Sequence, residues 1–156
     1  MEKVIGIGEF GISNQVNDTI RTYALASCVA ITVYSSKKKV AGMIHVALPM
    51  PGEKNLHKLG LAYFATTGIP LLFERLYNIY GCSKDELKIH MYGGADSIRQ
   101  DDQFRIGMRN VEAARSTLAE LNLMIHHAEV GGTCSRTLLM EVATGKVQVT
   151  TQPLSI

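Results

Sequence analysis

Two apolar runs, Val29–Tyr34 and Val40–Leu48, dominate the hydrophobic pattern of the chain, and a short segment rich in lysine separates them. Apolar runs of this length on either side of a charged segment are typical of two strands joined by a tight turn. The pattern therefore predicts a β-hairpin. With a four-residue loop at Ser35–Lys38, Tyr34 pairs with Lys39.

Two residues with reactive side chains stand near the open end of this hairpin. In the register just described, Cys28 lies opposite His45, and directly opposed residues have Cβ atoms roughly 4.5–5.5 Å apart. A slip of one residue would place the two side chains on opposite faces. Two interpretations follow from the spacing. Either Cys28 is a small buried apolar residue and His45 a core histidine, or the imidazole activates the thiol as a nucleophile.

The rest of the chain alternates further strands with helices. Apolar or alternating segments predict strands at 3–7, 87–92, 123–130, 136–142 and 146–150, and helical spacing predicts helices at 69–81 and 110–121. Polar and glycine residues favour a loop at 9–19, and Pro70 is expected to start or interrupt a helix. Antiparallel ribbons mixed with helical crossovers indicate an α+β fold with mixed or antiparallel sheets and helices packed on one side.

Composition narrows the classes of protein that fit. A length of 156 residues predicts a single domain over 1–156. A hydrophobic fraction of 46% and a charged fraction of 19% are those of an ordinary soluble globule. A net charge of +2 with few aromatic residues does not favour nucleic-acid binding. The apolar stretches are too short for membrane insertion, and the chain starts without a secretory pattern.

The numbers and spacings of cysteine and histidine residues bear on disulfide bonds and metal sites. Three cysteines at unrelated spacings do not make a disulfide framework, and five scattered histidines lack the spacing of a metal site. We therefore expect a cytoplasmic protein with reduced thiols and without a metal. Phe104 is the one large apolar side chain of a polar segment at 95–108, so it either tucks into the core or anchors a protein partner.

Several short motifs resemble those of the bacterial chemotaxis protein CheD family. The first two are Thr22-x5-Cys28, with Ala-Ser-Cys-Val-Ala ahead of an apolar strand, and Ala-Gly-Met-Ile-His45-Val-Ala-Leu-Pro49. Further matches are Tyr92-Gly93-Gly94-Ala95, Ile106-Gly107-x-Arg109-Asn110, Gly131-Gly132-x3-Arg136 and Thr144-Gly145-Lys146-Val147. The resemblance spans about residues 18–150, in the order and spacing of the family.

The resemblance implies an enzyme that deamidates glutamine side chains in the cytoplasmic domain of chemoreceptors, without a cofactor. Cys28 would be the nucleophile, His45 the proton carrier and Thr22 the residue that orients the imidazole, while the backbone around Ser27–Val29 would hold the oxyanion. Thr22 lies six residues before Cys28, or about 20 Å in an extended strand. If Thr22 shares the site, Tyr23–Ser27 must therefore fold back.

The resemblance also bears on the fold and on two alternative functions. It implies a three-layer α/β/β arrangement similar to the catalytic domain of a glutamine-deamidating bacterial toxin. The chain has Ala26 where glycine is commonest in the family, which would strain the backbone if φ is positive there. One alternative function is an adaptor that binds a CheC-type response-regulator phosphatase. The other is a cysteine hydrolase with a different amide or ester substrate.

Overall fold

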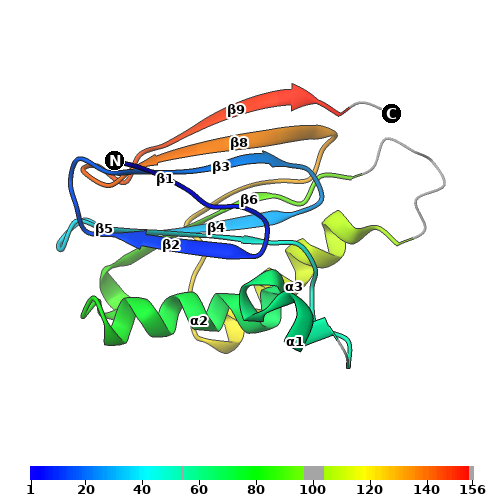
Figure 1. The fold of residues 1–156 in the computed structure, drawn as a ribbon, viewed down its shortest axis with the longest axis horizontal. Helices are drawn as coiled ribbons and strands as arrows, with labels where there is room; N and C mark the ends of the chain where they lie inside the picture. Colours follow the sequence, from blue (N-terminus) through cyan, green and yellow to red (C-terminus); the bar gives the residue numbers. More distant parts are fainter. Residues whose placement is uncertain (54, 97–103, 155–156) are drawn as a thin grey trace.

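Two β-sheets lie one on top of the other, and helices cover the free face of one of them (Figure 1). The computed structural model describes residues 1–53, 55–96 and 104–154. The outer sheet has the strand order β1 (Glu2–Val4), β3 (Thr19–Leu25), β8 (Cys134–Glu141) and β9 (Val147–Pro153). The inner sheet has the order β2 (Glu9–Ser13), β5 (Val40–Val46), β4 (Val29–Ser35), β6 (Leu87–Gly93) and β7 (His127–Val130).

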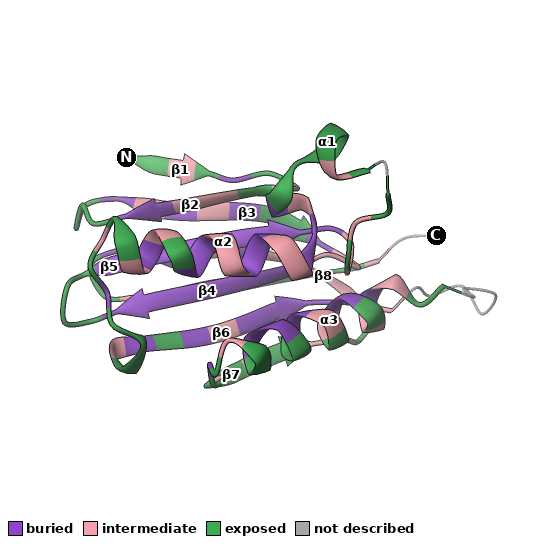
Figure 2. Ribbon diagram, turned by 90° about the horizontal axis from the view of Figure 1, so that it is seen from below, coloured by how far each residue is buried: buried purple, intermediate pink, exposed green. Residues whose placement is uncertain are grey.

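The helices make the third layer. They are α1 (Asn55–Leu59), α2 (Ala65–Asn78) and α3 (Ile106–Glu120), with short 3₁₀ turns at Leu61–Tyr63 and Lys84–Glu86. Seen from below, α2 and α3 lie over the inner sheet (Figure 2), and buried residues of both helices belong to the same core as those of β4. This arrangement confirms the predicted α+β fold with three layers and helices on one side. Within the described residues, no helix has the length and apolar character needed to cross a membrane.

Burial on both faces explains why β4 and β5 read as continuous apolar runs. Every residue of both strands is buried. In β4, Val29, Ile31 and Val33 belong to the core under the helices, whereas Ala30 and Tyr34 belong to the core between the sheets. The same alternation in β5 sends His45 toward the outer sheet.

The hairpin is present, but its register differs from the predicted one by two residues. Ser35 pairs with Val40, and Ala30 pairs with His45. The strand continues one residue further than expected, and Lys39 adopts a left-handed conformation (φ 55°) inside the turn. A shift of two residues keeps each side chain on its face, so Cys28 and His45 still point to the same side.

Two other predictions from the pattern are wrong, the first of them in part. The predicted loop at 9–19 is confined to 14–18, because Glu9–Ser13 forms β2 and Thr19 begins β3. β2 lies at the edge of the inner sheet, where one side stays open to solvent and polar residues are tolerated. Pro70 lies inside α2, whose apolar stripe of Ile69, Leu72 and Phe73 is buried. That packing outweighs the cost of the hydrogen bond that proline cannot donate.

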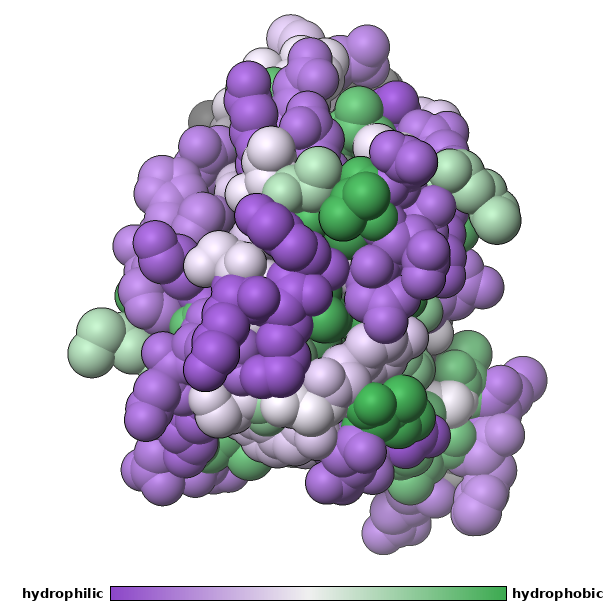
Figure 3. Space-filling model, turned by 90° about the vertical axis from the view of Figure 1, so that its left-hand side faces the viewer, coloured by the Kyte–Doolittle hydropathy of each residue, from purple (hydrophilic) through white to green (hydrophobic). Residues whose placement is uncertain are grey.

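The turn between β8 and β9 packs directly on an aromatic ring of the inner sheet. Gly145 has a φ of 77°, and a Cβ built there would lie 2.3 Å from the ring of Tyr34. The hydroxyl of Tyr34 donates to the Val142 carbonyl oxygen at 2.7 Å. The end of the molecule that carries this turn and the β4–β5 turn presents mainly hydrophilic side chains (Figure 3).

Replacing Gly145 with alanine should therefore destabilise the protein through both strain and overlap. We expect a loss of about 2–4 kcal/mol in the free energy of unfolding, measured by urea titration. Gly81→Ala is the matched control, because Gly81 also has a positive φ (68°) but nothing lies within 4 Å of its Cβ position. The control should lose only about 1 kcal/mol, the strain alone. Equal losses in the two variants would contradict the packing argument.

Candidate active site

The segment 26–28 carries the chain from the outer sheet to the inner sheet. β3 is bulged between Thr22 and Leu25, where Ala24 adopts a left-handed conformation (φ 53°). The chain then bends at residues 26–27 and enters β4 at Val29. Ala26 is not among the residues with positive φ, so alanine at that position does not carry the strain considered above. Cys28 is partly exposed at this crossing.

Thr22 and His45 meet across the two sheets. The hydroxyl oxygen of Thr22 lies 2.7 Å from Nδ1 of His45, and both side chains are buried. The two residues come together because β3 of the outer sheet lies over β5 of the inner sheet. The chain also turns back between Thr22 and Cys28, through the bulge and the bend at 26–27, as the six-residue spacing required, and the hydrogen bond that Thr22 makes is to His45.

A second hydrogen bond of Thr22 assigns the protons. The Thr22 hydroxyl donates to the carbonyl oxygen of Ile5 at 2.8 Å. A hydroxyl has one hydrogen, so toward His45 the same oxygen must accept. Nδ1 of His45 therefore carries the hydrogen, and the neutral ring keeps its lone pair on Nε2. Sequence reasoning had no signal for the role of the Ile5 carbonyl, because only the fold brings it to Thr22.

Burial keeps both candidate reactive groups neutral at rest. Desolvation lowers the pKa of His45 from 6.5 to about 4, and it raises the pKa of the Cys28 thiol. A backbone hydrogen bond from the N–H of Cys28 itself opposes the second shift. Nε2 of His45 is buried and has no hydrogen-bond partner in the described part of the chain. At rest the site thus holds a neutral thiol and a neutral imidazole whose Nε2 lone pair is free, with no hydrogen bond from Cys28 to that nitrogen.

The observed register sets the relation between Cys28 and His45. Ala30 lies opposite His45, so Cys28 is not its direct partner. The register, extended to the residue before β4, places Cys28 diagonal to His45 on the face toward the outer sheet. Diagonal neighbours lie about 7–8 Å apart, within reach of a long side chain. Cys28 packs against the core between the sheets, the same core that contains Ala30 and Met43.

The backbone before and at Cys28 is fixed by three hydrogen bonds. The carbonyl oxygens of residues 26, 27 and 28 accept, in that order, from Ala95 N (2.7 Å), Asn110 Nδ2 (2.9 Å) and Gly94 N (2.8 Å). In a trans peptide the N–H points away from the C=O. The N–H of Ser27 is therefore directed away from Ala95 and stays a candidate oxyanion donor. The N–H of Val29 lies on the β5 side, where Val29 pairs with Val46 in the strand ladder.

Neighbouring segments approach this loop very closely. A Cβ on Gly93 would lie 2.2 Å from the Cys28 carbonyl oxygen, and one on Gly107 would lie 2.1 Å from the Ala95 oxygen. Arg136 donates to the Gly93 and Gly131 carbonyl oxygens at 3.3 and 3.0 Å. Four of the short motifs noted in the sequence thus meet around Cys28. At the right-hand end of Figure 2, β4 begins, β6 ends and α3 begins.

Phe104 lies on the surface. Its side chain is 67% exposed, directly ahead of α3, so the expectation that it tucks into the core is wrong. The alternative role, contact with a protein partner, stays a prediction.

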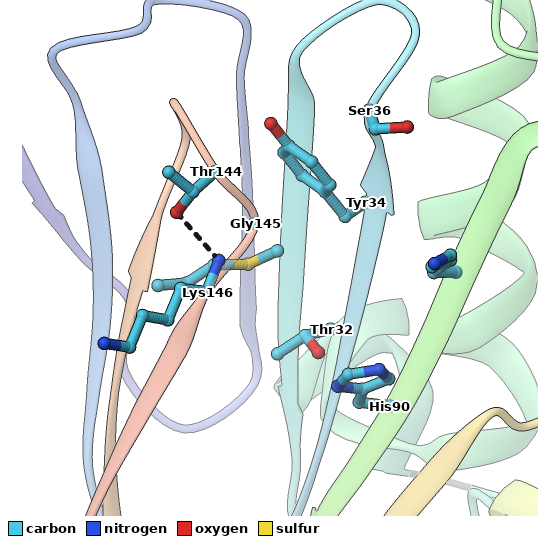
Figure 4. Close-up of a pocket in the computed structure, with 9 residues that line it drawn as sticks. Thr32, Tyr34, Ser36, His90, Thr144, Gly145 and Lys146 are labelled. Atoms are coloured by element: carbon cyan, nitrogen blue, oxygen red, sulfur yellow. Dashed lines mark hydrogen bonds between the residues drawn. The ribbon is translucent and has the colours of Figure 1, made fainter.

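A separate cavity of about 290 Å³ lies between the β8–β9 turn and strands β4 and β6. Thr32, Tyr34 and His90 line it from the inner sheet, and Gly145 and Lys146 line it from the turn (Figure 4). None of the three candidate active-site side chains lines this cavity. Cys28 directly precedes the first residue of β4, whereas the cavity is lined by Thr32 and Tyr34 further along the strand. Within the described ranges, no group of three or more His, Cys, Asp or Glu side chains is placed to hold a metal ion.

The titration of His45 should make stability depend on pH. Its folded-state pKa of about 4 lies below the unfolded value of 6.5, so the unfolded chain binds more protons between these values. Stability from this group is therefore complete above pH 6.5 and is lost as the pH falls toward 4. Between pH 7.5 and pH 5 the loss should be about 2 kcal/mol.

Urea unfolding at the two pH values measures this effect, and His45→Gln should show a correspondingly smaller loss. His90 shares the direction, since its pKa is also lowered by burial and by neighbouring histidines, so the variant should retain part of the slope. A slope unchanged by His45→Gln would contradict the assignment.

The architecture places the chain among α/β/β proteins with a cysteine and a histidine where the two sheets meet. Among solved structures, a hypothetical protein YfiH from Bacillus licheniformis has a TM-score of 0.54 at 11% identity, covering 80% of this chain and 51% of that one. YlmD from Geobacillus stearothermophilus has a TM-score of 0.54 at 10% identity, covering 79% and 50%. Similarity at this level of identity concerns the fold alone.

The chain belongs to the CheD family. The family model described as CheD chemotactic sensory transduction matches residues 47–151. The probable chemoreceptor glutamine deamidase CheD 1 of Syntrophus aciditrophicus is 38% identical over 147 residues, which cover 94% of this chain and 91% of the relative. The probable deamidase of Syntrophotalea carbinolica is 40% identical with the same coverage, and the chemoreceptor glutamine deamidase CheD of Halalkalibacterium halodurans is 38% identical over 85% and 83%.

Proposed function

We propose that this protein hydrolyses the side-chain amide of glutamine residues in the cytoplasmic domain of chemoreceptors, acting in the cytoplasm. The names of its relatives support the substrate and the reaction. The observation that carries the mechanism is the Thr22–His45 hydrogen bond, because the Ile5 carbonyl fixes its direction and so keeps the lone pair of His45 on Nε2.

In the first half of the reaction, Nε2 of His45 takes the proton of the Cys28 thiol as Sγ attacks the glutamine Cδ. The carbonyl oxygen becomes an oxyanion, which the backbone N–H of Ser27 stabilises. The imidazolium then gives its Nε2 proton to the amide nitrogen. The C–N bond breaks, ammonia leaves, and a thioester joins Cys28 to the substrate.

In the second half, water takes the place of ammonia. His45 removes a proton from this water as its oxygen attacks the thioester carbonyl, and the C–S bond breaks. The proton returns to the Cys28 sulfur, and a glutamate side chain leaves. Thr22 accepts the Nδ1 hydrogen throughout and holds the tautomer. The net reaction consumes one water, releases one ammonia, and uses only groups of this chain.

The proposal includes a CheC-type phosphatase as a second partner. The exposed ring of Phe104 supports this contact, because it lies directly ahead of α3, the helix that contributes Asn110 to the site. A partner there would lie close to the nucleophile loop and could compete with the receptor.

The test is peptide mapping by mass spectrometry of a purified receptor cytoplasmic fragment after incubation with the protein. We expect the mass gain that accompanies replacement of an amide –NH₂ by –OH at particular glutamines. No gain, together with retained binding to a CheC-type phosphatase, would favour the adaptor function. Release of ammonia only from unrelated amides would favour a different hydrolase.

A further inference from the structure

One side chain of α3 joins the two segments that carry the candidate reactive groups. Asn110 is completely buried. Its Nδ2 atom donates to the Ser27 carbonyl oxygen at 2.9 Å and to the Ala47 carbonyl oxygen at 3.0 Å. Ser27 directly precedes Cys28, and Ala47 lies two residues after His45. Both hydrogens of the amide group are thus used to connect the nucleophile loop to the end of β5.

The other half of the same amide makes no bond. Oδ1 of Asn110 is buried without a hydrogen-bond partner in the described residues. A buried oxygen without a partner is a cost to stability that an apolar side chain at this position would avoid. The two hydrogen bonds of Nδ2 are what an apolar side chain could not make.

Thr117 is a useful comparison on the same helix. It is also buried, at 5% exposure, but its hydroxyl donates to the Ala113 carbonyl oxygen within α3. Among the described residues, the Thr117 hydroxyl makes no hydrogen bond to another element, so Thr117 mainly fills space in the core. Asn110 differs because its bonds leave the helix and end on two segments that are far apart in the sequence.

We propose that Asn110 is a positioning residue, which sets the distance between the Cys28 thiol and Nε2 of His45 by holding Ser27 and Ala47 on one amide group. It touches no reacting atom. Gly94 and Ala95 hold the nucleophile loop only to the end of β6, so Asn110 supplies the side-chain link from the loop toward the β5 side. A displacement of about 1 Å in such a pair costs about 10²-fold in rate. This inference rests on the proposed function and adds a residue to its site.

The test is a double-mutant cycle read by alkylation of Cys28 with iodoacetamide. The rate is followed on the Cys28 peptide by mass spectrometry at pH 7, in the native protein, His45→Gln, Asn110→Leu and the double variant. In the native background, His45→Gln should slow alkylation about tenfold or more, since the imidazole no longer takes the thiol proton. In the Asn110→Leu background, the same change should alter the rate less than about twofold, because the pair is already separated.

Thr117→Val is the matched control, since it removes a buried polar group from the same helix and should leave the effect of His45→Gln intact. Asn110→Ser covers the case in which the leucine variant does not fold, because a hydroxyl keeps one donor and should give an intermediate effect. Equal effects of His45→Gln in the native and Asn110 backgrounds, including no effect in either, would overturn the proposal. Alkylation needs no receptor, so failure of deamidation and failure of this coupling are distinguishable.

Discussion

Cys28→Ala should abolish release of ammonia from receptor glutamines, with a loss of about 10⁴–10⁶-fold in the rate of deamidation. Removing the nucleophile of a covalent mechanism leaves only the binding and oxyanion contributions, and losses of this size are typical of such enzymes. The fold should persist, because Cys28 is only partly buried and alanine fits beside the core between the sheets. Peptide mapping of the receptor fragment measures the rate, and near-ultraviolet circular dichroism checks the fold.

Cys134→Ala is the matched control for this experiment. Cys134 is also a partly buried free thiol, at the start of β8, and it makes none of the hydrogen bonds described for the site. Its replacement should leave the rate within about twofold of the native value, as expected for substitutions away from a site. Equal product from Cys28→Ala and the native protein would exclude the thioester mechanism.

His45→Gln should lower the deamidation rate by about 10²–10⁴-fold, the range for loss of general acid–base catalysis. The side chain transfers a proton in both halves of the proposed reaction, so neither thioester formation nor its hydrolysis keeps a proton carrier. Glutamine is of similar length, which limits the change in packing against Thr22. Rates at saturating receptor concentration show whether the chemical step, rather than binding, is affected.

His57→Gln provides the comparison, because His57 is exposed on α1 and lies outside the site. Its effect should be small. A native-like rate in His45→Gln would mean that another group carries the proton, and the assignment of the Nε2 lone pair would then have no catalytic meaning.

The hairpin shows what local sequence determines and what it does not. Two continuous apolar runs around a lysine-rich turn predict β4 and β5, whereas the shared face of Cys28 and His45 depends also on the register that is assumed for the turn. The predicted register differs from the observed one by two residues because the turn begins at Ser36 and includes Lys39. Lys39 takes a left-handed conformation, which a lysine in the sequence gives no reason to expect. Period-two alternation defines the face of a strand, but it does not define its exact partner.

The remaining parts of the site depend on contacts between elements that are distant in the sequence. Thr22 reaches His45 only because two sheets stack, and no spacing rule along one strand predicts that. Asn110 was visible as part of a motif, yet its bonds to Ser27 and Ala47 follow from where α3 docks. The edge strand β2 was missed because a strand with one open side can be polar.

The division of the site between two layers has a consequence for how the protein loses activity. Thr22 belongs to one sheet, whereas His45 belongs to the other, and the thiol sits where the chain passes between them. Catalysis therefore depends on the two sheets staying packed against each other and not only on each sheet being folded. Under mild denaturing conditions, the deamidation rate should fall while most backbone structure persists. The rate therefore reports whether the two sheets remain in contact.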